Sequence, residues 1–306
     1  MLKNKTFYSN GKLLLTAEYL VLDGAKALAL PTKFGQNLIV EETTGNAIEW
    51  TSFDADGTIW FQDNIKFQDI LFENKIDNNN KIRNTLLKIL HVAYTLNPDF
   101  ITNFSGYKIS TALTFQKSWG LGTSSTLLNN IAQWTNIDAF ELLQKSFGGS
   151  GYDIFCAQNN TPIQYQLINE KPVVAQVDFN PSFSNCIYFV YLNKKQDSKK
   201  AINYYLKNKL ETANYILKIN EISDQILRSK TASEFEILLQ QHENYLSEIL
   251  NQKTVKELLF SDFEGTIKSL GAWGGDFVLV VCQVNPTDYF KNKGFEVCIP
   301  YKEMIL

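Results

Sequence analysis

The sequence predicts an α+β protein, and three patterns carry this prediction. Residues 36–72 alternate apolar and polar side chains, as half-buried strands in hairpins do. Residues 82–96 and 233–250 instead repeat apolar side chains at helical spacing. Between these regions, an extended run over 106–115 leads into a glycine turn and then an apolar helical pattern. With 306 residues, of which 44% are hydrophobic, the chain is long enough for one large domain or two modest ones.

The individual elements follow from these periodicities and from the turn residues between them. Residues 5–16 are expected to form strands, and the apolar run over 11–24 predicts a buried strand that an Asp-Gly turn closes. Further helices are expected over 127–134, 139–147, 201–227 and 285–290, and further strands over 163–167, 173–177, 186–192, 277–282 and 295–299. Turns are expected at 44–46 and 54–57, a polar connector over 74–81, and a charged loop over 194–200.

The composition argues against several classes of protein. A formal charge of −3 and a pI near 5.6 give no reason to expect a nucleic-acid partner, which usually selects basic faces. No apolar run approaches the roughly 20 residues that a membrane span needs, and the N-terminal residues lack the pattern of a signal peptide. The four cysteines lie far apart in apolar runs, so we expect reduced core residues in a cytoplasmic protein without a membrane partner.

Arginine and histidine are scarce. Arg83 and Arg228 are the only arginines, so bidentate binding of an anion by arginine has just two candidates. The two histidines, His91 and His242, lie on apolar faces of predicted helices and are expected to be structural. With no third histidine and no His/Cys spacing, a transition-metal site is not expected.

Two charges interrupt the apolar run over 11–24. Lys12 and Glu18 are unusual there because charged side chains rarely lie inside such a run. They are either a lysine at a strand end and an exposed glutamate, or groups with a function.

The glycine turn after the strand at 106–115 is the most informative stretch. Its two glycines let the backbone curl tightly, and the hydroxyl residues that follow lie where a helix begins. Free N–H groups and the positive end of a helix dipole attract phosphate at such a place, and hydroxyls can bind Mg²⁺. An ordinary capped turn has the same pattern and stays an alternative. The residues concerned are Lys117, Gly120, Leu121, Gly122, Thr123, Ser124 and Ser125.

A second glycine-rich segment covers residues 148–153. Three glycines in four residues indicate backbone conformations that other residues resist, or the close approach of a ligand. Ser150 could merely cap a helix that begins near Tyr152, with Asp153 in its first turn. Capping explains Ser150 and Asp153, but it does not explain the glycines.

Several segments resemble motifs of the GHMP kinases, the superfamily of galactokinase, homoserine kinase, mevalonate kinase and phosphomevalonate kinase. The glycine turn resembles the GLGSS loop of that family. Residues 11–24 resemble Gly-Lys-x-x-x-x-Gly-Glu-His/Tyr-x-Val-x-x-Gly, with Ala17 in place of a glycine. The segment at 148–153 resembles the Gly-Ser-Gly-Phe-Asp form of the mevalonate and phosphomevalonate kinases. These matches follow the family's order along the chain.

The third family motif, Lys-x-x-Gly-Ala-Gly-Gly-Gly-Asp/Gly, resembles residues 268–276, with Trp273 at a glycine position. If the backbone needs a positive φ there, Trp273 is strained, and the loop follows a different path or narrows the acceptor pocket.

The resemblance implies the GHMP kinase fold, with an N-terminal half related to ribosomal protein S5 domain 2 and a ferredoxin-like C-terminal half. It implies an N-terminal ATP-binding domain over 1–180 and a C-terminal domain over 181–306, with ATP bound between them, in a monomer or homodimer.

The resemblance also implies roles for the matched residues. Lys12 and Asp153 would be catalytic, the lysine by neutralising charge on the transferred group and the aspartate by accepting a hydroxyl proton. Ser124 is the expected Mg²⁺ ligand and Glu141 a second one, although the spacing from Glu141 to Asp153 is about one residue off the mevalonate kinase pattern. ATP would bind the glycine turn and Lys117, and the acceptor would bind Glu18, Ser150, Gly151, Gly271, Ala272 and Gly274.

The motif forms also bear on the identity of the acceptor. Glu18-Tyr19, Lys117, residues 149–153 and residues 274–276 resemble phosphomevalonate kinase more than mevalonate kinase, while the short chain and the scarcity of arginine argue the other way. We expect a small-molecule acceptor of the mevalonate pathway, with phosphomevalonate slightly favoured over mevalonate. A homoserine or sugar kinase stays an alternative. A catalytically silent nucleotide-binding relative is another, because Ala17 and Trp273 depart from the motifs.

Overall fold

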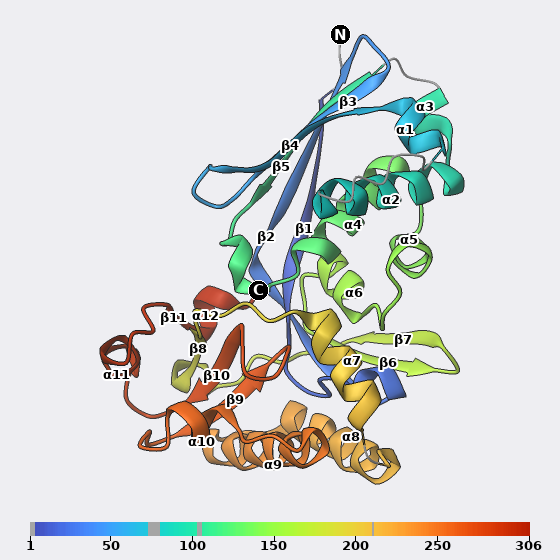
Figure 1. Cartoon of the computed structure of the whole chain (residues 1–306). Helices are drawn as coiled ribbons and strands as arrows, with labels where there is room; N and C mark the ends of the chain where they lie inside the picture. The colour runs from blue at the N-terminus through green and yellow to red at the C-terminus, as the bar shows by residue number, and fades with distance from the viewer. Residues whose placement is uncertain (1–3, 73–79, 103–105, 210) are drawn as a thin grey trace. The chain divides into compact units, whose positions relative to one another are not determined.

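The computed structural model describes residues 4–72, 80–102, 106–209 and 211–306. Its contacts divide the chain into two compact units, each built from segments that are far apart in the sequence (Figure 1). The predicted domain boundary at residue 180 refers to the organisation of the family and stays a prediction. The first unit consists of Met1–Gly11, Phe34–Lys117 and Leu121–Gln158, and the second of Lys12–Lys33, Ser118–Gly120 and Asn159–Leu306.

The first unit contains a mixed sheet with the strand order β4-β3-β5-β2, and β1 also pairs with β2. Strands β3 and β4 form an antiparallel hairpin, while β3 runs parallel to β5. Strand β5 is antiparallel to β2, from Gln36 opposite Leu113 to Thr43 opposite Gly106. The strands are β1 (Asn4–Leu14), β2 (Ala27–Thr43), β3 (Ala47–Phe53), β4 (Ile59–Lys66) and β5 (Gly106–Leu113).

The helices of the first unit cover this sheet and share a core with it. Trp50 and Ile109 from the strands belong to the same buried cluster as Leu90 of α2 and Ile131 of α4. The helical periodicity of the sequence is therefore satisfied by burying one face of each helix. The helices are α1 (Phe67–Phe72), α2 (Lys81–Leu96), α3 (Asp99–Thr102), α4 (Thr123–Thr135), α5 (Ala139–Ser146) and α6 (Tyr152–Gln158).

The second unit contains an antiparallel sheet with the strand order β11-β8-β10-β9. Strand β10 (Phe277–Val281) is buried along its whole length, because β8 and β9 pair with its two edges. The N-terminal part of β2 also belongs to this unit and pairs with β6. The other strands are β6 (Ile163–Ile168), β7 (Lys171–Gln176), β8 (Ile187–Tyr191), β9 (Thr266–Leu270) and β11 (Cys298–Pro300).

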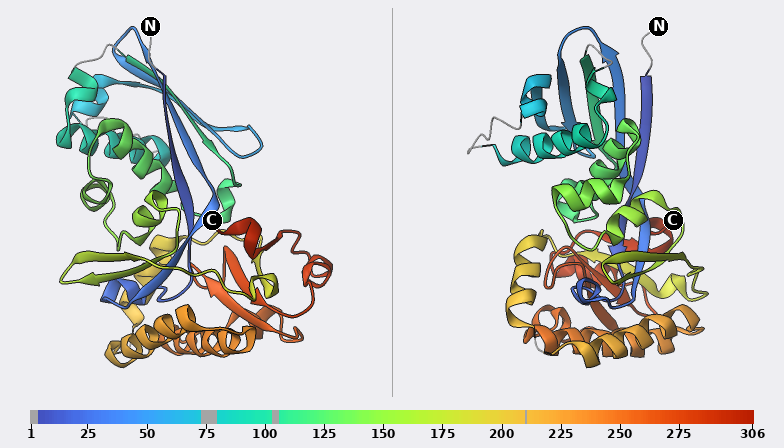
Figure 2. Two further views of the ribbon diagram at one scale, coloured as in Figure 1. Left: turned by 180° about the vertical axis from the view of Figure 1, so that it is seen from behind. Right: turned by 90° about the vertical axis from the view of Figure 1, so that its right-hand side faces the viewer.

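Two long helices of the second unit, α8 and α9, lie side by side, and α9 packs against β9 (Figure 2). A short 3-10 helix, η1 (Leu20–Asp23), ends at Gly24, whose φ is 86°. Further 3-10 helices are η2 (Lys117–Trp119) and η3 (Ser184–Cys186). The α-helices are α7 (Ser198–Asn208), α8 (Ala213–Arg228), α9 (Ala232–Leu250), α10 (Val255–Leu259), α11 (Thr287–Asn292) and α12 (Tyr301–Met304).

The predicted buried strand over 11–24 is wrong beyond Leu14. The amides of Leu15 and Thr16 both donate to the carbonyl of Leu28, and the chain then leaves the sheet in a turn followed by η1. The apolar continuity of this segment reflects burial, since Leu15 and Leu20 are nearly inaccessible, and not extended pairing.

Other differences have equally local causes. The turn at 44–46 does not join a hairpin, because β5 lies between β2 and β3. Residues 67–72 form α1 and not a strand, and Asp69 there pairs with Arg83 of α2. The single helix predicted over 201–227 is two helices, because Lys209 is extended and its ammonium pairs with Asp23. The connector expected over 74–81 falls mostly outside the described residues.

None of the four cysteines forms a disulfide within the described ranges, and three of them are buried. Within the ranges that the structure describes, no helix combines the length and apolar character that crossing a bilayer requires.

Candidate active site

The boundary between the two units crosses the glycine turn, with Ser118–Gly120 in the second unit and the residues from Leu121 onward in the first. In the second unit, Gly120 has a φ of 72°. Its carbonyl oxygen accepts a hydrogen bond from the ammonium of Lys12, at 3.3 Å. The structure therefore brings the predicted catalytic lysine to the predicted phosphate loop, although 108 positions separate the two residues in the sequence.

In the first unit, the turn continues into helix α4. Gly122 is the N-cap, with a φ of 98°, and it offers no side chain to cap the first turn of the helix. The hydroxyls of Ser125 and Thr126 are used internally, because both donate to the carbonyl of Gly122. Leu121 is fully buried and anchors the turn.

The two hydroxyls at the start of α4 differ from those that follow. The hydroxyl of Thr123 is buried and has no hydrogen-bond partner among the described residues. Ser124 is exposed to solvent. Buried polar groups nearly always have a partner, so an unpartnered hydroxyl beside uncapped backbone amides fits a bound anion better than a merely structural turn.

Lys117 precedes this turn and is held by the first unit. Its amide donates to the carboxylate of Asp54 at 2.9 Å. Its ammonium lies 4.5 Å from the centre of the Trp60 ring, which is cation–π geometry. The assignment of Lys117 to ATP binding stays a prediction.

The glycines at 148–151 adopt the conformations that the sequence indicated. Gly148, Gly149 and Gly151 have φ values of 69°, 109° and 87°. A Cβ atom on Gly151 would lie 2.4 Å from the ring of Phe140, so only glycine fits there. Ser150 is buried, and Asp153 lies half-buried in the first turn of α6. Ser150 therefore lies within a turn whose path depends on glycine, and Asp153 comes shortly after that turn.

Glu141, the predicted second metal ligand, is exposed in the first turn of α5 and pairs with Lys145 at 2.8 Å. Across the described parts of the chain, no three histidine, cysteine, aspartate or glutamate side chains gather as a metal-binding group. Ser124 therefore fits the predicted magnesium site better than Glu141, whose carboxylate already faces a cation. Both assignments stay predictions.

The third glycine-rich loop links β9 to β10 in the second unit. Positive φ values fall on Gly271, Gly274 and Asp276 and not on Trp273, so the tryptophan is not strained. The amide of Trp273 donates to the hydroxyl of Tyr19 at 2.7 Å, and its indole N–H donates to the carbonyl of Lys253. Ala272 beside it is buried. The glycine position of the motif thus tolerates a large residue here.

Asp276 at the end of this loop contacts the glycine turn. A Cβ atom on Gly120 would lie 2.5 to 2.8 Å from the carboxylate of Asp276, so glycine is required for this approach. The amide of Gln196 donates to Asp276 Oδ1 at 3.1 Å. Burial raises the pKa of Asp276 above its usual value, while the Gln196 amide and the charge of Lys12 oppose that rise. Asp276 is thus a carboxylate beside both Gly120 and Lys12.

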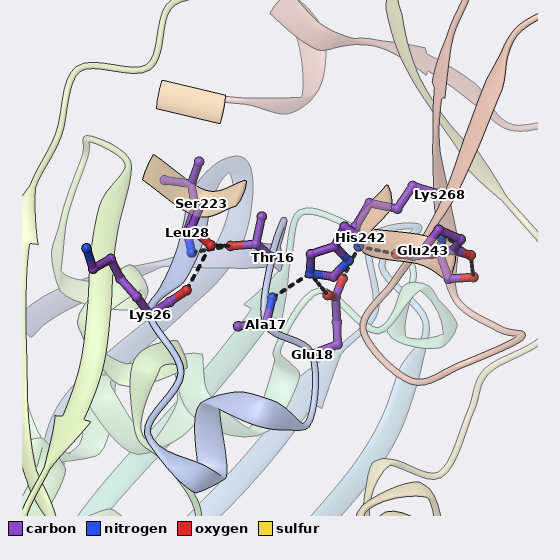
Figure 3. Close-up of polar contacts among 10 residues, drawn as sticks. Thr16, Ala17, Glu18, Lys26, Leu28, Ser223, His242, Glu243 and Lys268 are labelled. Carbon is purple, nitrogen blue, oxygen red and sulfur yellow. Dashed lines mark hydrogen bonds and ion pairs between the residues drawn. The ribbon is translucent and has the colours of Figure 1, made fainter. Parts of the chain in front are cut away.

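Glu18, predicted to bind the acceptor, is buried instead in a polar cluster of the second unit (Figure 3). Its Oε1 atom lies 2.5 Å from the ammonium of Lys268, which is also fully buried. His242 and Glu243 of α9 complete the cluster beside Ser269, whose amide and hydroxyl donate to Glu243. Glu18 has an exposed fraction of only 2%, and its assignment to acceptor binding stays a prediction.

The titration of this cluster is governed by burial. Burial raises the pKa of Glu18 to about 7, although Lys268 opposes the rise. Burial also raises the pKa of Glu243 and lowers the pKa of His242 well below its usual value. The imidazole is therefore neutral, and its Nε2 atom accepts the amide of Ala17 at 2.9 Å. The positive charge of Lys268 thus opposes the pKa rise of two buried carboxylates, Glu18 and Glu243.

Sequence reasoning assigned no role to Lys268, Glu243 or Asp276. The pattern that drew attention to Glu18, a charge within a buried apolar run, would also have indicated Lys268 and Glu243. Lys268 lies in the buried strand β9, and Glu243 lies beside the apolar stripe of α9. His242 is a core residue, as predicted, yet its Nδ1 atom has no hydrogen-bond partner within the described ranges.

Comparison with solved structures identifies the fold. Mevalonate kinase from Methanococcus jannaschii matches with a TM-score of 0.70 and 18% identity, over 97% of this chain and 98% of that one. Phosphomevalonate kinase from Streptococcus pneumoniae, in complex with phosphomevalonate and AMPPNP, matches with a TM-score of 0.69 and 14% identity, over 94% and 95%. A D-glycero-D-manno-heptose 1-phosphate kinase from Bacteriodes thetaiotaomicron matches at 0.68 and 14%, over 99% and 96%. No family model and no curated protein matches the sequence.

The chain therefore has the α+β fold of the GHMP kinases, which confirms the predicted fold class and the family resemblance at the level of fold. The matched structures cover nearly the whole chain and are themselves nearly covered by it. Their different acceptors, at 14 to 18% identity, leave the acceptor of this chain open.

Proposed function

We propose that this protein is an ATP-dependent small-molecule kinase of the GHMP type. The observation that carries the proposal is the glycine turn, where Gly120 and Gly122 have positive φ, α4 begins without a side-chain cap and the buried hydroxyl of Thr123 lacks a partner among the described residues. Lys12 lies on the carbonyl of Gly120. Uncapped amides and a nearby ammonium are what a transferred phosphate requires. The fold supports this assignment, because the matched structures are kinases.

In the proposed reaction, the amides at residues 120–125 bind the phosphates of ATP, with Lys117 nearby in the sequence. Lys12 neutralises the charge that develops on the transferred γ-phosphoryl group, which is a contribution of electrostatics and positioning. Mg²⁺, held through the exposed hydroxyl of Ser124, would supply further neutralisation of the phosphates. Glu141 stays the second proposed ligand, provided that it releases Lys145.

Asp153 accepts the proton of the acceptor if that acceptor is an alcohol. If the acceptor is itself a phosphate, no strong base is needed, because a phosphomonoester has a second pKa of about 6. Asp153 would then orient Lys12 and the metal ion. Ser150, Gly151, Gly271, Ala272 and Gly274 are proposed to shape the acceptor pocket.

For the acceptor, we infer a mevalonate-pathway compound, with phosphomevalonate slightly favoured over mevalonate. The motif forms at Tyr19 and at residues 149–153 support this choice. Of the two arginines, Arg83 already pairs with Asp63 and Asp69, and Arg228 lines a groove of about 410 Å³ at α8 and α9. A phosphorylated acceptor would therefore depend on lysine, which binds phosphate as a point charge.

A homoserine or sugar kinase stays the alternative within this fold. A catalytically silent nucleotide-binding relative stays a further alternative, since Ala17 adopts the left-handed conformation that suits the glycine of the motif, with a φ of 66°, while Trp273 does not adopt it. The cytoplasmic location, the monomer or homodimer, and the absence of nucleic-acid and membrane partners stay predictions from composition and resemblance.

The test is ADP release from Mg-ATP with mevalonate, phosphomevalonate, homoserine and galactose offered separately. We expect turnover with one acceptor, and we expect Asp153→Asn to lower kcat by about 10²- to 10⁴-fold while ATP affinity is kept. Asp99→Asn, which changes an exposed aspartate of the same unit, is the matched control.

A wild-type protein that binds Mg-ATP but turns over none of the four acceptors would contradict the mevalonate-pathway assignment. Undiminished turnover in Asp153→Asn would show that Asp153 is not the base that accepts the proton of the acceptor. A protein that binds no nucleotide at all would overturn the kinase proposal itself.

A further inference from the structure

We propose that Glu18 and Lys268 form a positioning pair, which fixes the turn over residues 16–19 so that Tyr19 holds the third glycine-rich loop through the amide of Trp273. The inference rests on the proposed function, because that loop matters for turnover only if it serves a kinase site. It assigns Glu18 to the support of the site and not to contact with the acceptor.

The turn over residues 16–19 needs external support. Ala17 and Tyr19 both have left-handed backbone conformations, with φ values of 66° and 64°. Residues other than glycine, asparagine and aspartate rarely have a backbone in this left-handed region. Where they do, contacts from the surrounding structure hold them there. Two of them flank Glu18, so the position of Glu18 is coupled to the path of the turn.

Contacts from two helices hold the backbone of this turn (Figure 3). The Ala17 amide donates to Nε2 of His242 on α9, at 2.9 Å. The hydroxyl of Thr16 lies 2.7 Å from that of Ser223 on α8, and it also accepts the amide of Leu28. These hydrogen bonds fix residues 16 and 17. The carbonyl of Glu18 accepts the amide of Leu20 at 2.8 Å, and its side chain provides the link to β9.

The Glu18 side chain is directed by Lys268 of β9. The ammonium lies 2.5 Å from Glu18 Oε1 and also donates to the carbonyl of Ser269 at 2.8 Å. Glu243 accepts the amide and hydroxyl of Ser269, at 3.0 and 2.7 Å. The ammonium is thereby anchored on the strand that leads directly into the loop at 271–276, so the pair ties the first motif to the third.

Tyr19 completes this connection. Its hydroxyl accepts the amide of Trp273 at 2.7 Å, inside the third loop. The same loop ends at Asp276, whose carboxylate lies against Gly120, and the Gly120 carbonyl accepts the ammonium of Lys12. A continuous series of contacts within the second unit therefore runs from the buried pair to the proposed catalytic lysine.

A buried ion pair is weak evidence for stability, because apolar side chains of similar volume often stabilise a core as well or better. What a charged pair supplies is a directional and short hydrogen bond. A positioning role therefore predicts that stability and function can be separated: neutralising both partners can restore the fold without restoring the geometry.

The first test changes only the link to the loop. Tyr19→Phe removes the hydroxyl that accepts the Trp273 amide and leaves the buried pair intact. We expect faster hydrogen–deuterium exchange in the peptide that covers residues 270–276, and a kcat/KM lowered roughly tenfold or more because a proposed catalytic group is displaced. Tyr301→Phe is the matched control, since Tyr301 is also buried in the second unit and donates to the carbonyl of Phe179.

The second test changes the pair itself, by comparing Glu18→Gln, Lys268→Met and the double variant. We expect each single variant to lose thermal stability and the double variant to recover only part of it, because Glu243 stays buried without the Lys268 ammonium. Exchange over residues 270–276 should stay fast in the double variant, and kcat should stay reduced. Adding Tyr19→Phe to the double variant should then lower kcat little further, because both changes act through the same contact between Tyr19 and Trp273.

Three outcomes would overturn the proposal. Tyr19→Phe could match the Tyr301→Phe control in exchange and kinetics. The double variant could recover activity together with stability, which would make the pair merely structural. Glu18→Gln could raise the KM of the acceptor with unchanged exchange, which would make Glu18 a substrate contact. If the wild-type protein has no kinase activity, the proposed function fails, while the exchange measurements still decide whether the pair positions the loop.

Discussion

Ala17 has a φ of 66°, in a region where the Cβ of an L-residue crowds the following carbonyl group. The corresponding position of the first family motif is a glycine, and this backbone explains why. In the present chain the side chain is a methyl group that is fully buried, and its amide is fixed by His242. The residue thus combines a strained conformation with favourable burial, which makes its substitution by glycine informative.

We predict that Ala17→Gly costs little stability, in contrast to Ala25→Gly. Both changes remove a buried methyl group, worth about 0.8 kcal/mol, and both add freedom to the unfolded chain. Only Ala17→Gly also relieves a left-handed conformation, worth roughly 1–2 kcal/mol. Urea denaturation should show a free energy of unfolding about 1–2 kcal/mol higher for Ala17→Gly than for Ala25→Gly. Equal losses in the two variants would mean that residue 17 carries no strain.

At the level of elements, helices that carry an apolar stripe were predictable and non-local pairings were not. Helices α2 and α9 begin and end within about a residue of their predicted limits, because their periodicity and caps are local signals. Asn80 and Thr231 cap them through their side chains. The insertion of β5 between β2 and β3 depends on pairing between distant segments, which no local pattern records.

The polar cluster joins the first motif, α9 and β9, and its titration should appear in the stability of the protein. The pKa of Glu18 is raised to about 7, so between pH 4.5 and 7 the native state keeps a proton that the unfolded chain releases. Stability contributed by Glu18 is therefore lost as the pH rises through this range. The lowered pKa of His242 acts in the opposite direction. At low pH the unfolded chain binds a proton that the native imidazole does not bind, so this contribution to stability increases as the pH rises.

We predict that Glu18→Gln removes the pH dependence that comes from Glu18 and leaves the one that comes from His242. The free energy of unfolding of the variant should rise more steeply, or fall less, between pH 5 and 7.5 than that of the wild-type protein. The difference in the free energy of unfolding between wild type and Glu18→Gln should shrink by on the order of 2–3 kcal/mol over this range. The reason is that a proton bound by only one of the two states changes stability by about 1.4 kcal/mol per pH unit. Urea unfolding at several pH values measures this difference, with Glu234→Gln, an exposed glutamate of α9, as the control. Parallel pH profiles for wild type and Glu18→Gln would show that Glu18 titrates normally.

For the molecule as a whole, nucleotide binding should be coupled to folding. A ligand that binds only the native state stabilises it by about 2.7 kcal/mol at a hundred times its dissociation constant. For a chain of this size, this corresponds to a rise in Tm of roughly 5 °C. We predict this shift with Mg-ATP in calorimetry, and no comparable shift with Mg²⁺ and inorganic phosphate. An unchanged Tm at millimolar Mg-ATP would remove the nucleotide from the proposed function.

The sequence located the parts of the candidate site but not their neighbours in space. The glycine turn, the glycines at 148–151 and the third loop were each visible as motifs, and their positive φ values bear out the conformational interpretation. The approach of Asp276 to Gly120 was not visible, because it joins segments more than a hundred residues apart. Glu18 was marked by its unusual charge, yet only the structure shows that Lys268 is its partner.

The 250 positions between Glu18 and Lys268 also have a consequence for biosynthesis. As the ribosome extends the chain, the turn at residues 16–19 emerges long before β9 exists, and the unit that contains both folds as a whole only after β9 has been made. A nascent chain that has not yet reached residue 268 holds Glu18 without its counter-charge and the left-handed turn without its anchor. The motif that is translated first is therefore the one whose structure is completed last.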